Sequence, residues 1–240
     1  MNNLVIDIGN TLAKFGVFKN GVVHSTTSVS SDNIEAELSD LTSTYCFDYV
    51  IVSSVKNLEI DIRQWIRPAG LMVFDYQTHL PIKNDYATPE TLGLDRLAGV
   101  VGAWEMFPKS NSLVIDCGTC LKFDFLNAKG HYLGGNISLG LKMRFSALNH
   151  YTDKLPLLQN KPISEIYGIS TESAIHTGVV QGATEEIKGT MQLFEQKFGK
   201  INTIITGGDA SVFEKRLKVP IFALPNLVLN GLHTILEFNI

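Results

Sequence analysis

Residues 5–18 read VIDIGNTLAKFGVF, and residues 114–126 read VIDCGTCLKFDFL. Each stretch predicts a buried strand that ends at Asp, a turn that contains Gly and Thr, and a second strand that carries Lys. The second copy is one residue shorter in its turn, GTCLK against GNTLAK. Because both copies share V-I-D-x-G, we interpret them as one unit present twice, in preference to a chance similarity between two apolar strands.

The repeated turns predict a phosphate-binding clamp. A strand that stops at Asp-x-Gly places a carboxylate, small side chains and turn amides at one edge of a sheet, where they can face a metal-bound polyphosphate. Asp7 and Asp116 are the paired carboxylates, and magnesium needs only one or two of these because it keeps several waters. Thr11 and Thr119 offer hydroxyls, and Lys14 can reach a phosphate oxygen. The alternative is that each Asp caps its own turn and that Lys14 is an exposed strand lysine.

Composition narrows the class of protein. The chain has 240 residues, of which 45% are hydrophobic and 18% charged, as in a well-packed soluble protein. A net charge of −4 argues against nucleic-acid binding, which needs a basic stripe. No stretch holds the roughly 18 consecutive apolar residues of a membrane span, and no signal-peptide pattern opens the sequence. We therefore expect a cytoplasmic protein that binds neither nucleic acid nor membrane.

Cys117 and Cys120 form a C-x-x-C pattern. It could be a redox pair or half of a zinc site, but zinc needs two further ligands, and the six histidines show no suitable spacing. A redox pair normally begins a helix, whereas this pair spans a predicted turn between strands. We favour small residues that fill a tight turn.

The repeat favours two similar lobes of mixed α/β structure, and a short polar break from Pro108 to Ser112 places their boundary between 1–110 and 111–240. In the first lobe we expect a three-strand meander over 4–29 with a hairpin at Asn20-Gly21, followed by alternating helices and strands. After the meander, the first-lobe elements are a helix over 33–44, a strand over 49–55, a helix over 59–66, a strand over 71–76 and a helix that begins at 94. The second-lobe elements are a meander over 113–140, a long helix after Ser170, a strand over 203–210 and a helix over 227–238.

Familiar nucleotide motifs are absent: the sequence has no G-x-x-x-x-G-K-[ST], no G-x-G-x-x-G after a strand and no G-x-S-x-G. Phosphate binding would therefore involve the two hairpins and the segment 206–209, TGGD.

A second group of candidate residues is Gly93-Leu94-Asp95-Arg96, at the start of a helix. Asp95 could accept a proton from an attacking hydroxyl, and Arg96 could hold an anion. The alternative is that Asp95 simply favours the helix dipole.

Six motifs together resemble one family. In chain order they are VIDIGNT, PETLGLDR, VIDCGT, LGGNISLGL, GISTESAIHTGVVQG and ITGGDA, and they span nearly the whole chain. They are similar to those of the type III pantothenate kinases. That family belongs to the acetate/sugar kinase, Hsc70 and actin superfamily, whose duplicated ribonuclease-H-like lobes match the repeat. The first motif is shared loosely across the superfamily, whereas G-x-D-R with an upstream Tyr is much more specific.

The resemblance implies a kinase that transfers the γ-phosphoryl of ATP to the hydroxyl of pantothenate, the first step toward coenzyme A. It implies ATP, magnesium and potassium or ammonium as cofactors, a homodimer, and Asp95 as the catalytic proton acceptor. The residues implied for ATP are Asp7, Gly9, Asn10, Thr11, Lys14, Thr119, Gly207 and Gly208. The residues implied for pantothenate are Tyr86, Gly93, Leu94, Asp95, Arg96 and Thr171. Asp116 is the implied ligand of the monovalent cation, and Asp7 that of magnesium, directly or through water.

The second lobe departs from the family pattern. Cys120 and Lys122 stand where the family has Ala and a second Thr, and ISLGL lacks the usual Pro. On an ideal strand, Lys122 and Asp124 point to the same face, so they could pair and leave Asp116 for the ion. We prefer potassium activation on this basis. The alternative is that the Lys122 ammonium itself replaces the cation.

Two other functions stay open. One is a superfamily kinase that acts on a sugar or a small acid, against which the Tyr86 and PETLGLDR signature argues. The other is a regulatory protein that binds nucleotide without turnover, against which the presence of Asp95 argues. A phosphotransfer assay separates these functions.

Overall fold

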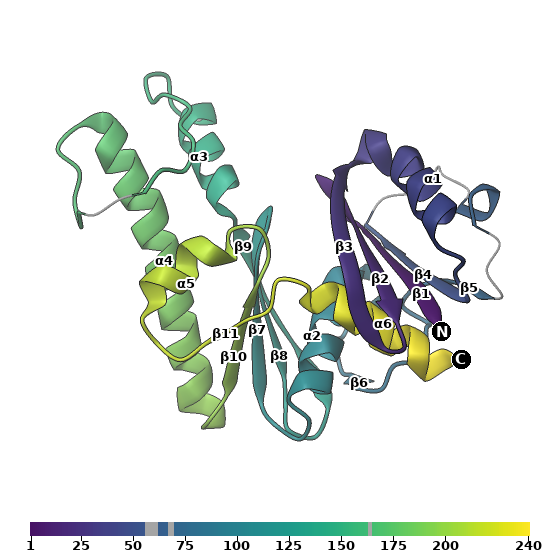
Figure 1. Ribbon diagram of the computed structural model, residues 1–240. Helices are drawn as coiled ribbons and strands as arrows, with labels where there is room; N and C mark the ends of the chain where they lie inside the picture. Colours follow the sequence, from purple (N-terminus) through teal and green to yellow (C-terminus); the bar gives the residue numbers. More distant parts are fainter. Residues whose placement is uncertain (56–61, 67–69, 163–164) are drawn as a thin grey trace. The chain divides into compact units, whose positions relative to one another are not determined.

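The computed structural model describes residues 1–55, 62–66, 70–162 and 165–240 (Figure 1). These residues form two compact units. Unit 1 contains Met1–Lys109, Leu126–Leu133 and Asn226–Ile240, and unit 2 contains Ser110–Phe125 and Gly134–Pro225. One mixed sheet lies within unit 1 and most of a second mixed sheet lies within unit 2, as expected for an α/β protein.

The first sheet contains the N-terminal meander. Its strands are β1 (Asn2–Ile8), β2 (Leu12–Lys19), β3 (Val22–Ser30), β4 (Tyr49–Ser54) and β5 (Gly70–Val73), and their order is β3-β2-β1-β4-β5. β2 pairs antiparallel with β1 and β3, whereas β4 pairs parallel with β1 and β5. Asn20 and Gly21 both have positive φ, 50° and 81°, as a two-residue hairpin of the primed type requires. The expected hairpin is therefore confirmed.

The second sheet repeats this arrangement. Its strands are β6 (Lys83–Asn84), β7 (Ser112–Cys117), β8 (Cys120–Leu126), β9 (His131–Leu139), β10 (Asn202–Thr206) and β11 (Phe222–Ala223), in the order β11-β10-β7-β8-β9-β6. Read from the meander, β9-β8-β7-β10-β11 corresponds strand for strand to β3-β2-β1-β4-β5. β10 is parallel to both β7 and β11, as β4 is to β1 and β5. This equivalence confirms the duplication and the fold class expected from the sequence.

Six α-helices are present among the described residues. They are α1 (Ile34–Thr44), α2 (Leu94–Met106), α3 (Leu141–His150), α4 (Thr171–Phe198), α5 (Ala210–Leu217) and α6 (Leu227–Asn239). The expected helices 33–44, from 94, after 170 and 227–238 are confirmed. The expected helix 59–66 is described only from 62 onward, where a single 3₁₀ turn covers Ile62–Gln64. The expected strand 71–76 is shorter and ends at Val73.

Helix α4 begins and packs as its sequence predicts. The Ser170 side chain accepts a hydrogen bond from the backbone N–H of Ser173, and the Ser173 hydroxyl accepts one from the Ser170 N–H. This reciprocal pair satisfies N–H groups that have no partner within the helix. Its apolar residues at helical spacing are buried: Ile175, Val179, Ala183, Ile187 and Met191. It packs on Phe123 and Phe125 of β8 in the core of unit 2.

The last helix belongs to the first unit. α6 packs on α2 through two glycines, since a Cβ on Gly102 would lie 2.5 Å from the Leu227 carbonyl oxygen and one on Gly231 would overlap the Ala98 carbonyl oxygen. Figure 1 shows α6, in yellow, near the purple strands of unit 1. Each compact unit is therefore made of more than one segment of the chain. The division into lobes 1–110 and 111–240 stays a prediction from the sequence repeat.

A buried histidine of α6, His233, should make the folded protein less stable in acid. His233 stacks on Phe18 with 4.0 Å between ring centroids, and its Nε2 lies 3.2 Å from the Asn3 amide nitrogen, which donates to the neutral ring. Burial lowers the pKa of His233 to about 4, partly opposed by Glu105. In the unfolded chain this histidine binds its proton near pH 6.5. The stability that the buried neutral ring contributes to the fold is therefore complete above that pH and is lost as the pH falls toward 4.

We expect the free energy of unfolding to fall by roughly 2–4 kcal/mol between pH 6.5 and pH 4 through this group alone. Denaturant unfolding at a series of pH values measures it. His233→Gln keeps an acceptor for Asn3 but does not titrate, so its unfolding should lose this part of the pH dependence. An unchanged pH profile in the variant would contradict the assignment to His233.

Candidate active site

The first hairpin places Asp7 and Lys14 opposite each other. Asp7 lies at the end of β1 and Lys14 on β2, and the two are direct partners in the antiparallel register. The turn is closed by the Gly9 N–H, which donates to the Leu12 carbonyl at 3.0 Å. Asn10 and Thr11 are exposed at its tip. A half-buried carboxylate, a cross-strand ammonium and an exposed turn thus meet at one sheet edge.

The second hairpin has the same construction. The Gly118 N–H donates to the Cys120 carbonyl at 3.1 Å, and Thr119 is exposed at the tip. Lys122 Nζ lies 2.6 Å from Asp116 Oδ2. Asp116 therefore already has the Lys122 ammonium beside it, which the sequence analysis did not expect, and its role as the ligand of a monovalent cation stays a prediction. Lys122 follows its turn as Lys14 does, so it faces the Asp that ends the preceding strand. An alignment of the two repeats on their lysines would have indicated this pair.

Gly207, directly after β10, lies against Asp116. Thr206 is the parallel-strand partner of Asp116, and Gly207 turns away with φ of +92°, a conformation that favours glycine. A Cβ on Gly207 would lie 2.5 Å from both Asp116 Oδ1 and the Cys117 carbonyl oxygen. The Asp209 N–H donates to that carbonyl at 2.9 Å, and burial raises the pKa of the Asp209 carboxyl. Segments 90 residues apart thus form one turn cluster in unit 2.

The GLDR motif begins α2 as expected. The Asp95 Oδ1 accepts a hydrogen bond from the Arg96 N–H at 2.9 Å. A Cβ on Gly93 would lie 2.7 Å from the same oxygen, so glycine leaves room for the carboxylate. The buried Arg96 guanidinium lies 5.7 Å from the centroid of the Tyr86 ring. The structure therefore brings the two sequence signals, the upstream Tyr and G-x-D-R, together.

Tyr132 supports this group and was not predicted. It is fully buried, and its ring stacks on Tyr86 with 6.0 Å between centroids. Nearby, the Asp85 carboxylate pairs with Lys83 and His131, each at 2.8 Å, and the Lys83 and His131 hydrogen bonds hold its pKa below the usual range. Asp85 and Tyr86 directly follow β6, and its parallel pairing with β9 joins residues far apart in the sequence, which no local pattern indicates.

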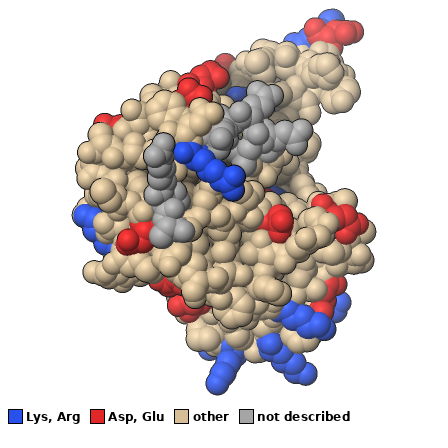
Figure 2. All heavy atoms as spheres, turned by 90° about the vertical axis from the view of Figure 1, so that its right-hand side faces the viewer, with Lys and Arg blue, Asp and Glu red and all other residues tan. Residues whose placement is uncertain are grey.

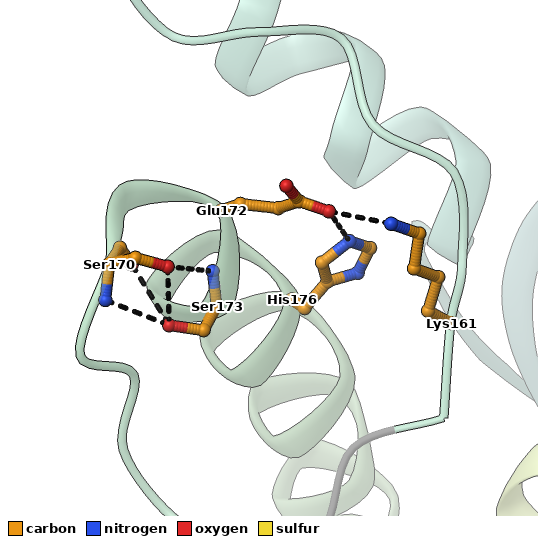
Figure 3. Close-up of polar contacts among 5 residues, drawn as sticks. All are labelled: Lys161, Ser170, Glu172, Ser173 and His176. Atoms are coloured by element: carbon orange, nitrogen blue, oxygen red, sulfur yellow. Dashed lines mark hydrogen bonds and ion pairs between the residues drawn. The ribbon is translucent and has the colours of Figure 1, made fainter.

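Thr171 is the first residue of α4 and is exposed. Figure 3 shows the start of this helix, where Glu172 reaches Lys161 at 2.6 Å and points toward His176, beside the Ser170–Ser173 cap. Thr171 also lines a groove of about 860 Å³ whose other walls are largely apolar residues of α3 and α4. The structure thus supports an accessible contact at this position.

The predicted site residues divide between the two units. Unit 1 holds Asp7, Gly9, Asn10, Thr11, Lys14, Tyr86, Gly93, Leu94, Asp95 and Arg96. Unit 2 holds Asp116, Thr119, Thr171, Gly207 and Gly208. Within unit 2, Gly207 lies against Asp116, Thr119 lies at the tip of the turn that follows Asp116, and Thr171 begins α4.

The described residues contain no group of three or more His, Cys, Asp or Glu side chains that could hold a metal ion. Magnesium does not require one, because it is commonly bound through one or two carboxylates, several waters and substrate phosphates. Asp7, a half-buried carboxylate beside an exposed turn, fits this mode.

The C-x-x-C pattern has no redox geometry. Cys117 and Cys120 are both free thiols, and Cys117 is buried in the core of unit 2. Burial, with the Asp116 and Asp209 carboxylates adding to it, raises the pKa of the Cys117 thiol well above its usual range. The reading of these residues as turn filler is supported.

At pH 7.5 we expect a thiol reagent to modify the exposed Cys46 rapidly and Cys117 slowly, because the thiolate is the reactive form. Peptide mapping by mass spectrometry after timed labelling measures both rates. Cys46→Ser should remove the fast phase. Rapid labelling of Cys117 in the folded protein would contradict this result.

Solved structures show the class of fold. A Baf family protein from Campylobacter jejuni matches with a TM-score of 0.64 and 18% identity, covering 98% of each chain. The activator of 2-hydroxyisocaproyl-CoA dehydratase from Clostridium difficile, solved with ADPNP, matches with a TM-score of 0.57 and 15% identity, covering 100% of this chain and 96% of that one. The duplicated sheets, together with these matches, show a fold of the acetate/sugar kinase, Hsc70 and actin type.

Sequence relatives identify the family. A family model described as type III pantothenate kinase matches residues 3–193. Two relatives of that name, from Cytophaga hutchinsonii and Phocaeicola vulgatus, are 41% and 42% identical to this chain. Each covers 99% of this chain, which in turn covers 100% and 98% of them. The chain belongs to the type III pantothenate kinase family.

Proposed function

We propose that this protein transfers the γ-phosphoryl group of ATP to the primary hydroxyl of pantothenate, giving 4'-phosphopantothenate in the first step of coenzyme A biosynthesis. The observation that carries the proposal is full-length family membership combined with an intact GLDR start of α2. The upstream Tyr86 lies against Arg96 of that motif. Phosphoryl transfer depends on positioning and charge neutralisation more than on covalent chemistry, and both hairpins are built for that.

On the nucleotide side, the exposed turn of the first hairpin binds the phosphates. Gly9, Asn10 and Thr11 bring backbone amides and a hydroxyl, and Lys14 supplies a positive charge beside Asp7. Magnesium bound through Asp7, directly or through water, would neutralise charge on the phosphates. In unit 2, Thr119 contacts ATP, and Gly207 and Gly208 let the backbone approach the adenosine.

On the acceptor side, Asp95 orients and deprotonates the pantothenate hydroxyl as it attacks. Its carboxylate is held by the Arg96 N–H and kept clear by Gly93. Gly93, Leu94, Arg96 and Tyr86 bind pantothenate around it, and Thr171 is a further contact from α4. Arg96 suits an anionic substrate because its guanidinium presents a planar fork of donors to a carboxylate.

A phosphotransfer assay tests this proposal. Purified protein with ATP and magnesium is offered pantothenate, a panel of sugars or acetate, and product is measured by mass spectrometry. We expect product from pantothenate alone. Transfer to a sugar or acetate instead would identify a superfamily kinase of another specificity. ATP binding without transfer to any acceptor would identify a nucleotide-binding regulatory protein.

The proposal also covers assembly and location. The groove beside Thr171 and the strongly exposed apolar side chains Tyr151 and Ile169, 82% and 92% exposed, support a homodimer through α3 and α4. Light scattering should give the mass of two chains.

Among the described residues no helix is long and apolar enough to cross a membrane. On the face in Figure 2, basic and acidic side chains both occur in small groups. A cytoplasmic location, where the enzyme meets ATP, completes the proposal.

Potassium or ammonium at Asp116 is what the family resemblance implies for the cofactor. In this chain the carboxylate already holds the Lys122 ammonium. The residues at this position therefore do not fit an open monovalent-cation site.

A further inference from the structure

In both hairpins, a lysine on the second strand lies opposite the aspartate near the end of the first strand. Each places an Asp at the end of its first strand and a Lys on its second strand, on the cross-strand side of that Asp. In the second hairpin the ion pair joins Lys122 Nζ and Asp116 Oδ2 at 2.6 Å. The two side chains are only 14% and 21% exposed, so solvent screens their attraction weakly. Such a pair is more persistent than one at the open surface.

The surroundings of Asp116 leave little freedom to its carboxylate. Its Oδ1 lies against Gly118 and Gly207, where added Cβ atoms would approach it to 3.4 and 2.5 Å. Its Oδ2 holds the lysine ammonium. A potassium or ammonium ion at the same oxygen would meet a like charge within a few ångströms, an unfavourable arrangement in a poorly solvated position. The lysine therefore competes directly with any such ion.

We propose that Lys122 is a tethered cation: its ammonium supplies the positive charge at Asp116, so phosphotransfer by this enzyme requires neither potassium nor ammonium. This inference rests on the proposed kinase function. Lys122 is a positioning residue. It neutralises Asp116 beside the Gly118-Thr119 turn, so that the turn can accept an anionic phosphate without a repelling carboxylate next to it. A bound ion would do the same, but the covalent tether removes the dependence on ion concentration.

The test compares wild-type protein with Lys122→Thr in choline, sodium, potassium and ammonium chlorides at equal ionic strength. We expect wild-type kcat/KM for ATP to vary by less than about twofold among the salts. Lys122→Thr should lose roughly 10- to 100-fold in choline and sodium, the range for losing one charge-assisted contact. Potassium or ammonium should restore most of the kcat/KM that this variant has lost. Lys200→Thr, an exposed lysine in the same unit, is the matched control and should behave as wild type.

Thermal unfolding gives a readout that does not depend on turnover. Potassium in place of sodium should raise the unfolding midpoint of Lys122→Thr and leave that of the wild type unchanged, because only the variant has a site for the ion. Lys122→Gln, which also removes the charge but fills more of the space, serves if the Thr variant does not fold. The wild-type salt comparison needs no variant at all.

Several results would overturn the inference. Severalfold activation of the wild type by potassium or ammonium would show that an ion, not Lys122, carries the charge. A foldable Lys122 variant that responds to no cation in either assay would show that the lysine does not stand in for one. By contrast, a wild type that phosphorylates no pantothenate in any salt contradicts the proposed function, and the unfolding midpoints then still decide on Lys122 alone.

Discussion

Asp95→Asn should lower kcat by roughly 10²–10⁴-fold while ATP still binds, because the change removes the base that accepts the hydroxyl proton but keeps the shape of the side chain. The amide oxygen of Asn can still accept the hydrogen bond that the Arg96 N–H donates to Asp95 at 2.9 Å. The start of α2 should therefore stay intact. A loss of turnover without a loss of structure is the signature expected of a general base in the proposed reaction.

Steady-state kinetics with pantothenate, combined with calorimetric titration of ATP, measure the two quantities separately. Asp153→Asn, at an exposed carboxylate, is the matched control and should keep wild-type kcat. A near-normal kcat in Asp95→Asn would remove Asp95 from the mechanism. Equal losses of ATP binding and turnover would instead indicate that the residue organises the site and does not transfer the proton.

Gly231→Ala should lower the free energy of unfolding by about 3 kcal/mol or more, at the upper end of overpacking effects. The added Cβ would overlap the Ala98 carbonyl oxygen of α2 and come within 2.8 Å of the Gly102 nitrogen. Both are backbone atoms, so no side-chain rotation relieves the clash. The two helices must move apart, and the apolar residues that α6 buries, including Leu232 and Ile235, lose contacts.

Chemical denaturation measures the change, and Gly182→Ala is the control. Gly182 lies inside α4, and an added Cβ there meets no atom within 4 Å. That variant should be more stable than wild type by roughly 0.5–1 kcal/mol, because Ala restricts the unfolded chain and favours helix. If Gly231→Ala were as stable as the control, the close approach of α6 to α2 would be wrong.

Local patterns predicted most elements because their causes are local. The hairpin at Asn20-Gly21 follows from the positive φ that its turn demands, and the start of α4 follows from the Ser170 cap. The face of α4 follows from apolar spacing alone. The predictions were weaker where pairing decides the outcome. The strand expected over 71–76 ends three residues early, at Val73, because the parallel pairing of β5 with β4 reaches only from Gly70 to Val73.

The sequence by itself determined the duplication and the family, because both reside in motifs that are contiguous along the chain, and it supplied the candidate site residues whose roles are proposed above. The tertiary structure decided what depends on distant segments: the stacking of Tyr132 on Tyr86, the packing of α6 with the first unit, and the contact of Gly207 with Asp116. It also decided the partner of Lys122. Alternation along a strand predicts which face a side chain occupies, and the pairing of β7 with β8 places Lys122 against Asp116.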